Sequence, residues 1–64
     1  MNWLKTKLWN KTYYILLHNS EELACIEIDK DNDFKYCLSV GGVYEGNFKT
    51  LKDAKNFSMG KLVG

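Results

Sequence analysis

The side chains that could bind a metal or attack a substrate are few in this chain. His18, Cys25 and Cys37 are its only soft metal ligands, whereas a structural zinc site needs about four, usually as two closely spaced pairs. A catalytic cysteine–histidine pair would need a pocket, and a chain of 64 residues has little volume from which to build one. We therefore expect no catalytic residue, no metal site and no cofactor, and we expect that the protein is not an enzyme.

Three alternating aspartates, Asp29, Asp31 and Asp33, imitate the start of a calcium-binding loop. An EF-hand would need glycine at the position of Phe34 and a bidentate glutamate at the position of Val40. Both positions carry the wrong residue, and Phe34 fits the start of a strand. The segment is therefore predicted to be a solvated turn between two strands.

The composition is that of one small globular domain covering residues 1–64, with 45% hydrophobic and 14% aromatic residues. No apolar run approaches the roughly 18 residues that a membrane-spanning helix needs, and the lysine-rich start does not resemble a signal peptide. We expect a cytoplasmic protein with free thiols and no membrane contact. The net charge is +1 and all nine basic residues are lysines, so no guanidinium is present for bidentate contacts to guanine or phosphate.

Hydrophobic patterning predicts an antiparallel sheet of three or four strands. Strands are expected at residues 12–18, 22–28 and 34–40, with a short fourth strand at 43–48 after the Gly41-Gly42 turn. Residues 1–11 fit either a short strand or a helix, and a strand is preferred. Gly46 is expected to mark a bulge or a close approach of another backbone segment.

One helix is expected after the sheet. Thr50 is a typical N-cap, with Asp53 three residues later, and Gly60 is expected to end the helix before a loose tail at residues 61–64. Leu51, Ala54 and Phe57, with Ser58, would face the sheet. The predicted class is α+β, with the C-terminal helix packed on one face of the sheet.

Strand registers built from these turns leave an apolar strip on the other face. A two-residue turn at Asn19-Ser20 puts Tyr14 opposite Cys25 and Leu16 opposite Leu23, and a three-residue loop at 30–32 puts Ile28 opposite Phe34 and Cys25 opposite Cys37. One helix covers only one face, so the strip is expected to be a binding surface or a dimer interface. Its predicted members are Tyr14, Leu16, Leu23, Cys25 and Cys37.

The N-terminal aromatic residues leave two arrangements open. Trp3 and Trp9, which alternate with lysines, could extend the binding surface, because tryptophan is favoured at interfaces. Alternatively Trp3, Leu4, Leu8 and Trp9 could fold back over the strip and bury it within the chain.

The run from Gly46 to Lys55, with the pattern G-x-F-x-T-x-x-x-A, resembles the end of AP2-type domains and of the arm-binding domains of tyrosine integrases, in which three strands pack on one helix. It also looks like the end of many small phage and prophage proteins of unassigned function. The resemblance covers about a third of the chain. It implies that the sheet face away from the helix, here with Glu27, Lys35, Cys37 and Ser39, could contact DNA.

The resulting expectation is a non-enzymatic, phage-encoded interaction protein acting in the cytoplasm of a bacterial host. It would bind a host protein through the uncovered sheet face, as a possible inhibitor of a defence or transcription complex, and a homodimer through the same face is a further possibility. The alternative is a small nucleic-acid-binding module on that face. Phosphate contacts from Lys35, Lys49 and Lys52 would make such binding weak and salt-sensitive.

Overall fold

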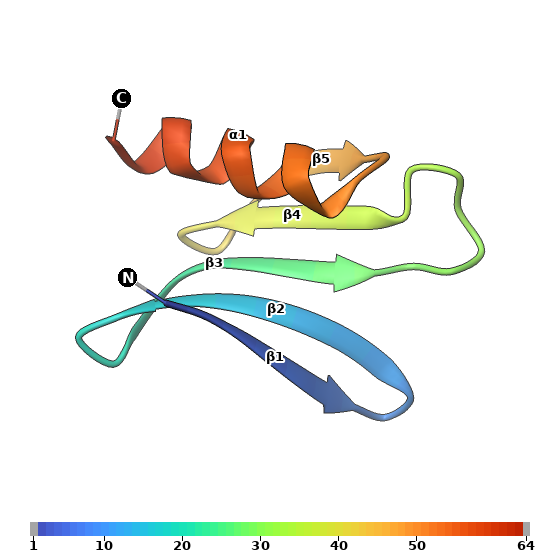
Figure 1. The fold of residues 1–64 in the computed structure, drawn as a ribbon, viewed down its shortest axis with the longest axis horizontal. Helices are drawn as coiled ribbons and strands as arrows, with labels where there is room; N and C mark the ends of the chain where they lie inside the picture. The colour runs from blue at the N-terminus through green and yellow to red at the C-terminus, as the bar shows by residue number, and fades with distance from the viewer. Residues whose placement is uncertain (1, 64) are drawn as a thin grey trace.

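The computed structural model describes residues 2–63 and contains one antiparallel sheet followed by one helix (Figure 1). The strands pair in sequence order, β1-β2-β3-β4-β5, so each strand joins the next through a hairpin. The α+β class and the C-terminal helix are confirmed, but the sheet has five strands where three or four were expected. The elements are β1 (Asn2–Leu8), β2 (Lys11–His18), β3 (Glu21–Ile28), β4 (Tyr36–Val40), β5 (Val43–Phe48) and α1 (Leu51–Val63).

The extra strand comes from the N-terminal segment. Trp9 and Asn10 both have positive φ angles, of 54° and 66°, which is the backbone of a type I′ turn. Such a turn matches the twist of an antiparallel pair, so β1 adds to the sheet beside β2. The turns at Asn19-Ser20 and Gly41-Gly42 likewise have positive φ angles at both residues, and both turns were predicted from the sequence.

The pairing of β2 with β3 differs from the predicted register because β3 contains a bulge. His18 and Leu17 lie opposite Glu21 and Glu22, but Leu16 lies opposite Ala24, so Leu23 is the extra residue. A bulge reverses the face on which the following residues lie relative to a simple count. The predicted pairs of Tyr14 with Cys25 and of Leu16 with Leu23 are therefore wrong.

The β3–β4 connection is longer than predicted. The amide of Asp29 donates to the carbonyl of Lys35 (2.7 Å), and Asn32 caps the loop by accepting from the amide of Phe34 (2.9 Å). Strand β4 therefore begins at Tyr36, and Phe34 stays outside it with 46% of its surface exposed. The register moves by two residues, which keeps the predicted faces but places Cys37 opposite Glu27 and not opposite Cys25.

Helix α1 begins as the sequence predicts, with the amide of Asp53 donating to the hydroxyl of Thr50 (3.1 Å). Its end was predicted wrongly, because the helix continues through Gly60 to Val63 and Leu62 packs against the core. Residues 61–63 are thus helical and not a loose tail, while the end of the predicted tail, Gly64, lies outside the described residues. Ala54 and Ser58 are fully buried, whereas Phe57 lies at the margin against Phe48, with 5.3 Å between ring centroids.

The core forms between α1 and one face of the sheet, and α1 lies along β4 and β5 (Figure 1). Four strand residues and two helix residues have at most 2% of their surface exposed: Leu16, Ala24, Ile26, Leu38, Ala54 and Ser58. No second helix occurs in residues 2–63, so the opposite face of the sheet has no covering element.

Candidate functional site

The uncovered side of the sheet, here called the open face, is built from residues that oppose one another across all five strands. Its first row is Leu4, Ile15, Cys25, Ser39 and Tyr44, and its second row is Thr6, Tyr13, Glu27, Cys37 and Asn47. Six of these residues line a shallow hollow of about 380 Å³ at β2, β3, β4 and β5: Tyr13, Cys25, Glu27, Cys37, Ser39 and Tyr44. The surface is broad and shallow, which suits contact with another macromolecule better than enclosure of a small substrate.

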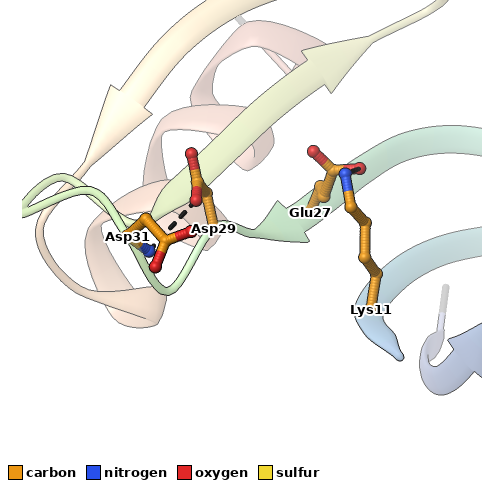
Figure 2. A network of polar contacts seen from close by, with 4 residues as sticks. All are labelled: Lys11, Glu27, Asp29 and Asp31. Carbon is orange, nitrogen blue, oxygen red and sulfur yellow. Dashed lines mark hydrogen bonds and ion pairs between the residues drawn. The ribbon is translucent and has the colours of Figure 1, made fainter. Parts of the chain in front are cut away.

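Charge on the open face is largely neutralised within the chain. The Nζ of Lys11 lies 3.6 Å from a carboxylate oxygen of Glu27, and Figure 2 shows these two side chains reaching each other from β2 and β3. The pair is partly exposed, so it adds little stability. It does leave the centre of the open face without a strong field of either sign.

The two thiols of the open face are held in their neutral form at pH 7. Partial burial raises the pKa of Cys25 and of Cys37, and nearby carboxylates, including that of Glu27, raise both further. Cys25 and Cys37 are diagonal neighbours, since each faces a different residue across the β3–β4 pair. Diagonal Cα atoms lie about 7–8 Å apart, beyond the usual span of a disulfide, and both thiols are free.

Partial burial and the Glu27 carboxylate also raise the pKa of Tyr13. The thiols and the phenol in the middle of the open face are therefore protonated at pH 7. This region offers apolar and hydrogen-bonding contacts but no activated nucleophile.

The structure divides the predicted strip between the two faces. Cys25 and Cys37 lie on the open face as predicted. Leu16 is 1% exposed in the core, and Tyr14 and Leu23 pack against that core from the helix side, so the expected placement of these three is wrong. The physical reason is the β3 bulge at Leu23, which moves Tyr14 opposite Ile26.

The two tryptophans lie in different parts of the structure. Trp3 lies on the helix side, opposite Leu16, with the Nζ of Lys55 5.3 Å from its ring centroid. Trp9 lies at the tip of the β1–β2 hairpin, 88% exposed. The N-terminal segment therefore does not fold back over the open face, and Leu4 and Leu8 remain 51% and 57% exposed.

Sequence reasoning missed Tyr13, Ile15 and Tyr44 as members of the open face. The alternation within residues 12–18 places Tyr13 and Ile15 on one side and Tyr14 and Leu16 on the other. Both sides are apolar, so the pattern could not choose which one meets the helix. The short run Glu21-Glu22-Leu23 beside the turn carries no residue type that marks a bulge.

The lysines of the nucleic-acid alternative do not form one patch with the open face. Lys35 lies in the β3–β4 loop, Lys49 follows β5 with its Nζ 5.2 Å from the ring centroid of Phe34, and Lys52 lies in the first turn of α1. Each has an exposed side chain. They surround one end of the β4–β5 hairpin, where the helix begins.

The aspartate-rich turn uses its oxygens internally. A carboxylate oxygen of Asp29 accepts from the amide of Asp31 (3.1 Å), as Figure 2 shows, and its carbonyl accepts from the amide of Asn32 (3.3 Å). This is the hydrogen bonding of a solvated turn. In residues 2–63 no three His, Cys, Asp or Glu side chains are grouped so that they could hold a metal ion.

No helix among the described residues has the length and apolar content to cross a membrane. Comparisons of the chain with protein-family models, with curated proteins and with solved structures find no match.

Proposed function

We propose that this chain is a non-enzymatic interaction protein that binds another protein through the open face. The observation that carries the proposal is the sidedness of the fold: α1 packs along β4 and β5 and the core forms on its side of the sheet, whereas the other face keeps apolar residues in contact with water. Exposed apolar surface of this kind is typical of sites where proteins bind one another. A host protein as partner and a phage origin rest on the resemblance described above.

The chemistry of the open face favours an uncharged, apolar partner surface. Leu4, Ile15 and Cys25 form a continuous row across β1, β2 and β3, with Tyr44 at the end of the row on β5. The opposite charges of Lys11 and Glu27 neutralise each other. Aromatic and aliphatic residues around a neutral centre are the usual composition of an interface core.

Trp9 supports the same proposal from the end of the hairpin. It has φ 54°, a backbone region that costs a bulky residue roughly 1–2 kcal/mol, and its ring is 88% exposed. A glycine or asparagine would suit this turn better. An unfavourable tryptophan in water is explained if the ring is buried in a complex, where tryptophan contributes strongly to binding.

The total surface is consistent with an uncovered face. The chain exposes 4617 Å², whereas a folded monomer of 7.4 kDa exposes about 4,200 Å² on average.

Nucleic-acid binding on the same face has less support. The Lys11–Glu27 ion pair leaves the open face without the free positive charge that phosphate binding needs, while Lys35, Lys49 and Lys52 lie around one end of the β4–β5 hairpin. A gel shift at low salt separates the two functions. A complex that dissociates as salt is added would favour the nucleic-acid function.

Two neighbouring residues of β5 provide a matched test. Tyr44 belongs to the open face and Val43 opposes Val40 on the helix side, and they are 63% and 62% exposed. Because both are at the surface, Tyr44→Asp and Val43→Asp should fold equally well.

In affinity capture from host lysate with mass spectrometry, Tyr44→Asp should lose the partner and Val43→Asp should keep it. Equal capture by the two variants would overturn the assignment to the open face. Size-exclusion chromatography of the purified chain tests whether a second copy occupies the face, in which case only Tyr44→Asp would shift a dimer to a monomer.

A further inference from the structure

The two edges of the sheet differ, and only one is a regular strand. At the β5 edge the register with β4 shifts between Leu38 and Ser39, Gly46 has φ 138°, and the side chain of Asn47 donates to the carbonyl of Phe34 (3.0 Å). A bulged edge that is tied to a loop cannot extend the sheet easily. Strand β1 has seven residues in unbroken register with β2 and, within residues 2–63, no other strand beside it.

The hairpin geometry decides which amides of β1 point away from the sheet. In a two-residue type I′ turn the closing pair, here Leu8 and Lys11, is hydrogen-bonded. Hydrogen-bonded and non-hydrogen-bonded pairs then alternate along an antiparallel ladder. The backbone N–H and C=O groups of Trp3, Lys5 and Lys7 therefore point outward, ready to pair with one more strand.

The side chains of β1 indicate which residue types the additional strand should contain. Lys5 and Lys7 lie on the helix side and are exposed, and within residues 2–63 neither has a carboxylate at ion-pair distance. On the same side, the Nζ of Lys55 adds a third positive charge near Trp3. Leu4 and Leu8, on the other side, continue the open face to the edge.

We propose that β1 accepts an extended segment of a partner protein in which acidic residues alternate with apolar ones. Acidic side chains two residues apart would oppose Lys5 and Lys7, and opposite charges across a strand pair are stabilising. The apolar side chain between them would oppose Thr6, and the apolar side chains on either side of the acidic pair would lie beside Leu4 and Leu8. Backbone pairing supplies affinity and the charge pattern supplies selectivity.

The same lysines disfavour a second copy of the chain at this edge. The antiparallel register that pairs all seven residues of two β1 strands places Lys5 opposite Lys5 of the second copy. Like charges directly opposite are destabilising, and lysine on an edge strand is a known means of preventing self-association. The proposal concerns the edge of the sheet and is independent of the proposed function of the open face.

The test uses two capped seven-residue peptides, one alternating valine with glutamate and one alternating valine with lysine. Each is titrated into the ¹⁵N-labelled chain at pH 7, and amide shifts are followed by NMR. The valine–glutamate peptide should shift Trp3, Lys5 and Lys7 most and bind roughly tenfold more tightly than the lysine peptide. No shift of these amides at millimolar peptide, or equal affinity for the two peptides, would overturn the proposal.

Two further measurements separate backbone pairing from charge alone. N-methylation of alternate peptide amides, on the side that would face β1, should abolish binding without any change in the protein. Lys5→Pro removes an outward N–H and should also abolish binding, while Lys5→Thr keeps that N–H and should weaken binding only about threefold. Unchanged binding of the N-methylated peptide would contradict strand addition, and so would a stable dimer of the free chain through β1. Tyr44→Asp should leave peptide binding unchanged.

Discussion

Ile15 and Ile26 show how differently the two faces of this sheet are used. Both are isoleucines in the middle of a strand, on β2 and β3, and each opposes a residue of the neighbouring strand. Ile26 has 0% of its surface exposed beneath α1, whereas Ile15 is only half-buried on the open face. Burial in this chain is therefore decided by the position of one 13-residue helix and not by the hydrophobicity of the strand residues.

The largest effect should come from the covered face. Ile26→Ala removes a fully buried side chain and leaves a cavity between β3 and α1, which should lower the free energy of unfolding by about 2–5 kcal/mol. That is a large share of the stability of so small a domain. Urea unfolding followed by circular dichroism measures the loss, and a loss below about 1 kcal/mol would contradict the position of the core.

The matched substitution on the open face should cost much less. Ile15→Ala removes the same atoms from a half-buried site, so we expect a loss of about 1–1.5 kcal/mol and a chain that still folds. The same urea titration applies. A loss as large as that of Ile26→Ala would mean that something covers the open face, such as a second copy of the chain.

The stability of α1, the helix that packs on one face of the sheet only, depends on its first turn. Thr50→Ala removes the hydroxyl that accepts from the amide of Asp53 and should cost about 1 kcal/mol. Thr50→Ser keeps the acceptor and serves as the control. If the two variants are equally stable, the cap contributes nothing to holding α1 on the sheet.

The smallest effect concerns pH and the thiols of the open face. Burial raises the pKa of Cys25 and Cys37 in the folded chain above the ordinary value of 9.0, so the unfolded chain releases these protons first. Stability should be level below about pH 8 and fall as the pH rises through about 9. Urea midpoints between pH 7 and 9.5 under reducing conditions measure this fall. The double variant Cys25→Ala/Cys37→Ala should flatten it, and an unchanged slope would show that the thiols are as exposed when folded as when unfolded.

Local signals predicted most elements because those signals act within a few residues. The β-branched and aromatic run at 12–18, the Gly41-Gly42 turn and the Thr50 cap were each read correctly from adjacent residues. The strand at 43–48 was predicted with its observed bounds. The helix end was misjudged, because packing of Leu62 against the core carries α1 past Gly60.

Membership of the candidate site was predicted less well. Cys25 and Cys37 were assigned to the open face correctly, but Tyr14, Leu16 and Leu23 were not, because one bulged residue reverses the outcome of a strand count. The turn at Trp9-Asn10 was missed, because Trp-Asn is not one of the residue pairs that are common in type I′ turns. Without that turn β1 could not be recognised as an edge strand.

The amino-acid sequence alone determined that this chain forms an antiparallel sheet and a capped helix, because periodicity, turn residues and capping are properties of neighbouring residues. Only the tertiary structure decided which face of each strand meets the helix. Strand β2 is apolar on both sides, so its local pattern is satisfied by either orientation. The choice is made by the β3 bulge and by the packing of Ala54 of α1 into one core with Ile26 and Leu38, residues far apart in the chain.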